Sequence, residues 1–200
     1  MQAFTKNNFN ALFGPLEYRN SIVYFRKRQI IFSQGDPNDR IFRIEEGTVK
    51  ATVNSRHGKE AIIGLFRRGD FFGESCISPH LRVRSYNAVA LIETKVLQLS
   101  RTSVLQKLRA STSASSAFIE YVIKRNQLLQ DDLASALLDT SQQRLNRALS
   151  SFSQALEKNK ANRLARVSQQ TLAEAIGASR QRVNFLLRNR RGAGSLRIAV

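Results

Sequence analysis

Four polar side chains lie close together in the segment SQQTLAEAIGASRQRVNFLLRNRR, which spans residues 168–191. Arginine can donate two hydrogen bonds to guanine O6 and N7, and glutamine or asparagine can pair bidentately with adenine in the major groove of DNA. We therefore expect Arg180 and Gln181 to contact base edges. Arg182 and Asn184 are expected to contact bases or nearby phosphates.

The same segment has the spacing of two short helices joined by a tight turn. Ser168 and Ser179 can each accept a backbone N–H at the start of a helix. Gly177 lies between them and can adopt the positive φ that ends the first helix. Small Ala173 lets the two helices cross at a steep angle, and Val183 closes their contact, which is the arrangement of a helix-turn-helix. Four larger residues complete the expected inner face: Leu172, Ile176, Leu186 and Leu187.

The net charge favours a polyanionic partner. The chain carries +17 at pH 7, and residues 158–200 hold ten Lys or Arg against the single acid Glu174. Clustered cations gain free energy by displacing counterions from phosphates. A basic surface that only keeps the protein in solution is the alternative, and the helix-turn-helix favours duplex DNA over it. Residues at the helix starts and on the flank are expected to bind phosphates: Ser168, Gln169, Ser179 and Arg188.

Length and composition limit the other possibilities. With 200 residues, 42% of them hydrophobic, the chain can form one or two domains. It has no apolar segment of signal-peptide length and no run of about 20 apolar residues, so we expect a cytoplasmic protein that does not cross a membrane. Cys76 is the only cysteine, which rules out an internal disulfide and argues against an iron–sulfur cluster. No Cys/His spacing predicts a metal site.

Short apolar runs separated by turn residues fill the chain from about Arg28 to Gln98. Runs of this length, with Gly, Asp and Pro between them, predict an antiparallel roll of short strands. The expected strands are Ile30–Phe32, Ile41–Ile44, Val49–Val53, Ala61–Phe66, Tyr86–Ile92 and Lys95–Leu99.

Helical periodicity follows these strands. Ser100 is the expected N-cap of a helix over residues 101–108, and a longer helix is expected after the Ser-rich stretch 110–117. Apolar residues of the longer helix step by three and four, so they share one stripe. The stripe consists of Ile119, Val122, Asn126, Leu129, Leu133 and Ala136. It predicts either pairing of two such helices, in which Asn126 sets the register, or packing on the roll.

Taken in order, these segments resemble the Crp/Fnr family of bacterial regulators. Three parts carry the resemblance: IIFSQGDPNDRIFRIEEGTVK (30–50), GDFFGES (69–75) with Arg84-Ser85, and the helix-turn-helix. The resemblance implies an α+β fold with an antiparallel β-roll similar to cyclic-nucleotide-binding domains, a long dimerisation helix and a winged helix-turn-helix. The implied division is a sensor domain over 1–110, the dimerisation helix over 111–139 and a DNA-binding domain over 140–200. Duplex DNA, a second copy of the chain and RNA polymerase are the implied partners.

The segment around Gly73 resembles that family's phosphate-binding cassette. In relatives that bind cyclic AMP, a Gly-Glu pair opens a short helix whose N–H groups meet the phosphate, the Glu holds the ribose hydroxyl, and an Arg-Ser pair follows. The matching residues here are Gly73, Glu74, Ser75, Arg84 and Ser85. Cyclic AMP or a related cyclic nucleotide is therefore the implied effector, with further contacts to Leu129 and Gln130 of the long helix. Many members keep this turn without binding a nucleotide, and in that case Glu74 and Arg84 could pair with each other.

The chain departs from the family pattern at four places. Leu129 and Gln130 stand where cyclic-AMP-binding relatives carry a Thr-Ser pair. Bulky Tyr86 stands where they usually carry a small residue, and Phe185 stands where some relatives place a base-contacting Arg. The stretch 192–200 is shorter than the usual β-hairpin wing, so we expect an abbreviated wing or a truncated chain.

Three other interpretations remain. Cys76 or His80 could ligate a haem, although a lone Cys and a nearby His are usually ordinary turn residues. A cyclic-nucleotide-binding module that acts on a protein partner is the alternative function, and the helix-turn-helix spacing argues against it. An enzyme is the least favoured, because the sequence, with only His57 and His80, contains no nucleophile–base or metal constellation.

Overall fold

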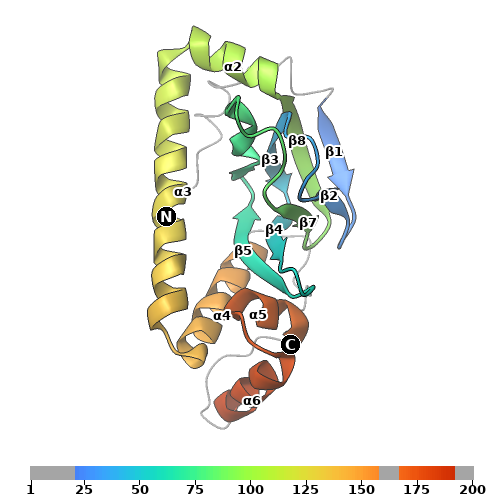
Figure 1. Cartoon of the computed structure of the whole chain (residues 1–200), viewed down its shortest axis with the longest axis vertical. Helices are drawn as coiled ribbons and strands as arrows, with labels where there is room; N and C mark the ends of the chain where they lie inside the picture. Colours follow the sequence, from blue (N-terminus) through green and yellow to red (C-terminus); the bar gives the residue numbers. More distant parts are fainter. Residues whose placement is uncertain (1–20, 158–166, 192–200) are drawn as a thin grey trace.

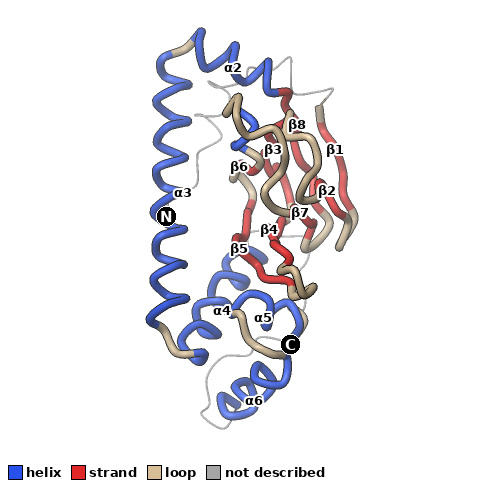
Figure 2. The backbone as a smooth tube through the Cα atoms, viewed as in Figure 1, coloured by secondary structure: helices blue, strands red, loops and turns tan. Residues whose placement is uncertain are grey.

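The short apolar runs of the N-terminal half pair into two antiparallel sheets of four strands each (Figures 1 and 2). The computed structural model describes residues 21–157 and 167–191. The first sheet has the order β1 (Ile22–Phe25), β8 (Thr94–Ser100), β3 (Arg40–Glu46) and β6 (Phe71–Phe72). The second has the order β2 (Ile30–Phe32), β7 (Asn87–Ala90), β4 (Thr48–Asn54) and β5 (Glu60–Arg67). Together they form a β-roll.

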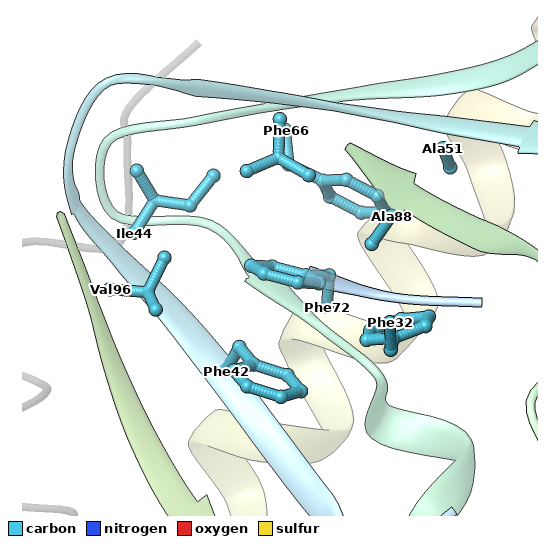
Figure 3. Close-up of a cluster of buried hydrophobic side chains, with 9 residues drawn as sticks. Phe32, Phe42, Ile44, Ala51, Phe66, Phe72, Ala88 and Val96 are labelled. Carbon is cyan, nitrogen blue, oxygen red and sulfur yellow. The ribbon is translucent and has the colours of Figure 1, made fainter. Parts of the chain in front are cut away.

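Aromatic side chains fill the inside of the roll (Figure 3). Phe72 is fully buried, and its ring centroid lies 5.0 Å from that of Phe42. The ring of Phe32 lies 5.6 Å from Phe42, and that of Phe66 lies 5.5 Å from Phe72. Since burying one such side chain contributes about 1.5–3 kcal/mol, this cluster supplies much of the free energy that holds the two sheets together.

The predicted antiparallel roll is confirmed, and each expected run contains a strand or lies within one. Two strands, β1 and β6, were not expected. β6 has only two residues, which pair with Phe42 and Arg43 of β3, and no local pattern reveals such a distant pairing. β7 is shorter than expected because Leu91, just after it, packs against the C-terminal helices instead.

Two helices follow the roll, α2 (Arg101–Ala110) and α3 (Thr112–Leu138). Ser100 caps α2, as expected, by accepting the Ser103 N–H at 3.1 Å. α3 begins within the Ser-rich stretch because Ser111 caps it, and it then runs along one side of the molecule (Figure 1). Tyr121 attaches α3 to β6: its buried hydroxyl donates to the Phe71 carbonyl and accepts the Phe71 N–H.

The C-terminal helices α4 (Ser141–Glu157), α5 (Gln169–Ile176) and α6 (Arg180–Arg191) share one hydrophobic core. Its buried members are Leu145, Leu149, Phe152, Val167, Leu172, Ala173, Ile176, Val183 and Leu186. Ile62 and Leu65 of β5, together with Leu91, pack against the same core. The helices therefore sit directly against the roll, with α6 at the end of the molecule away from it (Figure 1).

A partly buried charge cluster joins the roll to α5. Lys50 Nζ of β4 lies 2.7 Å from Glu60 Oε1 and 2.9 Å from Glu174 Oε2 of α5. Burial alone would lower the pKa of Lys50, but the hydrogen bonds to Glu60 and Glu174 raise it above its ordinary value. Nearby, the Thr48 hydroxyl donates to the Ala155 carbonyl of α4 at 3.2 Å. The C-terminal helices are thus attached to the roll by charge as well as by apolar contact.

The predicted α+β architecture of roll, long helix and C-terminal helices is confirmed. The expected abbreviated wing, residues 192–200, lies outside the described residues. The proposed domain boundaries stay a prediction, since α4 and α5 share their core with β5. In the described parts of the chain, no helix combines the length and apolar character needed to cross a membrane.

Candidate nucleic-acid interface and effector pocket

The turn between α5 and α6 has the expected backbone geometry. Gly177 ends α5 with a φ of 64°, and its N–H donates to the Ala173 carbonyl. Ser168 Oγ caps α5 by accepting the Thr171 N–H at 3.0 Å. Ser179 Oγ caps α6 by accepting the Arg182 N–H at 3.1 Å. Both helix starts and the turn are therefore fixed by the residues that the sequence places there.

Helix α6 has one buried face and one exposed face. Val183 is fully buried and Leu186 nearly so, both in the core shared with α5, while Leu187 is half-buried. The exposed face carries the predicted base-reading residues: Arg180, Gln181 and Arg182 are exposed, and Asn184 is partly exposed. Phe185, 54% exposed, lies among them, with the Arg182 guanidinium 5.5 Å from its ring centroid. Guanidinium and amide groups thus share one accessible surface.

The predicted phosphate-binding residues occupy two places. Ser179 and Arg188 are exposed on the same helix-turn-helix unit as the base-reading residues. Ser168, also exposed, lines a cleft of about 570 Å³ between α5 and the roll, and Gln169 is half-buried beside it. Phosphate contact by these four residues stays a prediction, and Ser168 is the one that faces the roll.

The predicted seam of α3 is exposed along its length. Ile119, Val122, Leu129 and Leu133 are 57%, 39%, 43% and 60% exposed, and Asn126 and Ala136 are exposed as well. The residues of α3 that meet the roll lie on another face and include Tyr121. The alternative that this stripe packs on the roll of its own chain is therefore wrong. The stripe is an apolar surface that nothing in the described chain covers.

Three of the predicted effector residues, Gly73, Glu74 and Arg84, lie together where β6 turns into the short 3₁₀ helix η1 (Glu74–Ile77). Gly73 sits at that turn with a φ of 77°. A Cβ on Gly73 would lie 2.5 Å from Arg84 Nη1 and 3.1 Å from the Arg40 carbonyl oxygen, so the turn needs glycine for space as well as for its backbone angle. The Gly73 N–H donates to the Tyr86 hydroxyl at 2.9 Å.

Glu74 and Arg84 do not pair directly with each other. Arg84, 3% exposed, donates from Nη1 to the Gly73 carbonyl at 3.2 Å and from Nη2 to the Arg40 carbonyl at 2.7 Å. Its guanidinium lies 4.2 Å from the centroid of the Phe32 ring. Burial raises the pKa of Glu74 and lowers that of Arg84. Within the described residues, Glu74 Oε2 and Arg84 Nε are buried without a hydrogen-bond partner.

Comparison with known proteins places the chain in a family. The family model "Cyclic nucleotide-binding domain" matches residues 22–111. A curated relative, the CRP-like cAMP-activated global transcriptional regulator of Mycobacterium tuberculosis (strain CDC 1551 / Oshkosh), is 24% identical over 88% of this chain and 80% of its own. The chain belongs to the Crp/Fnr family of transcription regulators.

Solved structures show the same fold for this Crp/Fnr chain. The c-di-GMP-responsive global regulator CLP of Xanthomonas campestris matches with a TM-score of 0.76 and 20% identity, over 98% of this chain and 96% of its own. A CRP-family transcriptional regulator from Thermus thermophilus matches with a TM-score of 0.75 and 20% identity, over 89% of this chain and 88% of its own. Both likenesses span the roll, the long helix and the C-terminal helices.

Sequence reasoning missed Arg125, which reaches from α3 to the roll as Tyr121 does. Leu129 and Gln130, the predicted effector contacts, are exposed in the single chain. Arg125 instead places its guanidinium 4.5 Å from the Phe66 ring centroid, close enough to Gly64 that a Cβ there would lie 2.4 Å from Arg125 Nη2. The signal that could have found it is its position four residues after Tyr121, on the same face of α3.

The remaining sequence candidates lie around η1. Ser75 accepts from the Asn38 amide at 3.1 Å, and Ser85 is exposed. Cys76 is fully buried in the core of the roll, and burial raises the pKa of its thiol to about 11, whereas His80 is exposed. A buried thiol of high pKa is a poor ligand for a metal, since ligation needs the thiolate.

Proposed function

We propose that the chain is a sequence-specific regulator of transcription that binds duplex DNA as a homodimer. The observation that carries this proposal is α6: its inner face is buried against α5, and Arg180, Gln181 and Arg182 stand exposed on the outer face. These groups have the donor pattern that distinguishes base pairs in the major groove. Curated relatives that match over most of this chain are named as regulators, among them the regulator of Mycobacterium tuberculosis, in agreement with a binding function.

The second copy of the chain would pair along α3. The exposed stripe through Leu129 and Leu133 supplies the apolar surface, and Asn126 within it would set the register of two parallel helices. In such a dimer two copies of α6 would enter successive major grooves about 34 Å apart, and would therefore read an inverted repeat. RNA polymerase is the proposed protein partner of the DNA-bound dimer. The proposed location is the cytoplasm, where the chromosome lies.

The proposed effector is a cyclic nucleotide such as cyclic AMP, bound in the roll. The two unsatisfied atoms near Gly73 support this choice, because Glu74 Oε2 can accept from a hydroxyl and Arg84 Nε can donate to an anionic oxygen. Arg125 connects this place to α3, since its guanidinium stacks on Phe66 and its charge acts on Glu74. An effector that moved Arg125 would bias how the paired helices pack.

The roll also connects to the DNA-binding helices directly. Lys50 bridges Glu60 of the roll and Glu174 of α5, and Ile62 and Leu65 of β5 pack into the core of the helices. A shift within the roll would therefore change where α6 stands relative to α3. The alternative function, a nucleotide-binding module that acts on a protein partner, does not explain why the predicted base-reading groups of α6 are exposed.

Selection from a random pool of duplexes tests the proposed function. The full chain is incubated with duplexes that contain a random core of about 30 base pairs, with and without cyclic AMP, and the bound fraction is sequenced over several rounds. We expect enrichment of an inverted repeat with half-sites about one helical turn apart. Retention of duplexes without any enriched sequence would refute base reading, and a single unrepeated half-site would refute the dimer.

A further inference from the structure

We propose that the Tyr86 hydroxyl occupies the anion position of the proposed effector site, and that an anionic effector binds only by displacing this hydroxyl from the Gly73 N–H. This inference rests on the effector site of the proposed function, and it adds the residue that decides which ligand enters and how tightly. The evidence is the set of contacts around Gly73, Tyr86 and Arg84.

The Gly73 N–H is a donor whose direction the fold fixes. The positive φ of Gly73 turns the backbone at the end of β6, and the close approach of Arg84 Nη1 and the Arg40 carbonyl leaves no room for any side chain there. The N–H donates to the Tyr86 hydroxyl at 2.9 Å. A ligand oxygen that used this N–H would have to take the place of the Tyr86 hydroxyl.

Packing of its ring holds the Tyr86 hydroxyl in this position. The ring centroid lies 5.3 Å from that of Phe32 and 6.5 Å from that of Phe66, so Tyr86 extends the aromatic cluster inside the roll. Burial raises the pKa of the hydroxyl, which stays protonated and uncharged at neutral pH. A neutral oxygen therefore stands at the Gly73 N–H, where an effector would bring a charged one.

The charged groups nearby are incompletely satisfied while Tyr86 is in place. Arg84 uses both Nη atoms on backbone carbonyls, but its buried Nε has no hydrogen-bond partner among the described residues. Glu74 Oε2 is likewise buried without a hydrogen-bond partner among the described residues. A buried donor and a buried acceptor without partners cost free energy that a ligand with an anionic oxygen and a hydroxyl would recover. Tyr86 is therefore a displaceable occupant and not part of a finished core.

The Tyr86→Phe variant removes the hydroxyl and keeps the aromatic ring, so it tests the contribution of the hydroxyl alone. The variant keeps the packing against Phe32 but leaves the Gly73 N–H without its acceptor, so a ligand no longer competes for it. We expect calorimetric titration of the full chain to give cyclic AMP or cyclic GMP affinity about tenfold tighter for Tyr86→Phe than for the wild type. Tyr24→Phe, at a tyrosine that is 70% exposed, is the matched control and should leave the affinity unchanged.

A second readout follows the amide itself. Hydrogen exchange at the Gly73 N–H should accelerate in Tyr86→Phe without ligand and slow again when cyclic AMP is bound. In the wild type, saturating cyclic AMP should shift the Gly73 amide resonance, an experiment that needs no variant. Equal affinities of wild type and Tyr86→Phe for both nucleotides, including no binding by either, would overturn the inference. Duplex binding without nucleotide, measured on the same preparations, reports separately on the proposed function.

Discussion

Arg180 and Arg84 carry the same guanidinium group in opposite surroundings. Arg180 begins α6 and is exposed. Arg84 is 3% exposed, donates to the carbonyls of Gly73 and Arg40, and lies against the ring of Phe32. The side chains of the proposed DNA-binding surface are thus already accessible to a partner. The proposed effector pocket must first exchange internal contacts for external ones, which is what a switch requires.

Two glycines show the same difference at the level of the backbone. Gly73 and Gly177 both have left-handed φ values, 77° and 64°. A Cβ at Gly73 would meet Arg84 Nη1 at 2.5 Å, whereas a Cβ at Gly177 would meet nothing within 4 Å. The turn at Gly177 needs glycine only for its left-handed backbone, while the turn at Gly73 also needs glycine because a Cβ would crowd Arg84.

The largest loss of DNA affinity is expected from a charge placed in the proposed dimer interface on α3. Leu133→Asp places a charge in the exposed stripe of α3 and should separate the dimer. Affinity for the selected inverted repeat should fall roughly 100-fold, because the second half-site no longer binds intramolecularly. Sedimentation and fluorescence anisotropy measure both quantities, with Ala134→Asp, one position off the stripe, as control. A dimer that persists in Leu133→Asp would move the interface away from this stripe.

Gly73→Ala should cost more stability than Gly177→Ala. At Gly177 only the left-handed backbone is penalised, by about 1 kcal/mol. At Gly73 crowding against Arg84 is added, for a total of about 3 kcal/mol. Urea unfolding of the two variants gives the free energies directly. Similar losses would show that the pocket is no more tightly filled than the DNA-binding turn.

Lys50→Met tests the charge cluster between the roll and α5. The Glu174 side chain, which is 10% exposed, would lose its cation, so we expect the free energy of unfolding to fall by about 2 kcal/mol. Glu60 is more exposed, and its ion pair contributes little to this loss. Lys59→Met, at an exposed lysine, is the control.

The pH dependence of this loss follows from the raised pKa of Lys50. A raised folded-state pKa means that the stabilisation is complete below the ordinary lysine value of 10.5 and disappears as the pH rises through the folded value. The difference between wild type and Lys50→Met should therefore stay constant from pH 7 to 9 and narrow above pH 10.5. A difference that widens with pH would exclude the ion cluster as its cause.

Local patterns predicted the parts of this molecule whose reasons are local. The caps Ser100, Ser168 and Ser179, and the turn at Gly177, depend on residues three or four positions away, and the structure has them as expected. The contact from Lys50 to Glu174 spans 124 positions. Such contacts follow from how finished elements pack, so neither the attachment of α5 to the roll nor the filling of the pocket could be predicted.

The pocket illustrates this limit most clearly. The resemblance selected Gly73, Glu74 and Arg84 correctly as neighbours, and it marked Tyr86 as a departure by its size. That the Tyr86 hydroxyl accepts the Gly73 N–H appears only when the strands are paired. The prediction of effector contacts at Leu129 and Gln130 assumed a side of α3 that the single chain leaves exposed.

Arg180→Ala, measured on two duplexes, tests the central claim most directly. Affinity of the wild type and the variant is determined for the selected inverted repeat and for a random duplex of equal length at the same salt. We predict a loss of roughly 1–3 kcal/mol on the selected duplex and little change on the random one. Arg188→Ala, at a predicted phosphate contact, should weaken both alike. An equal loss on both duplexes for Arg180→Ala would contradict base reading by α6.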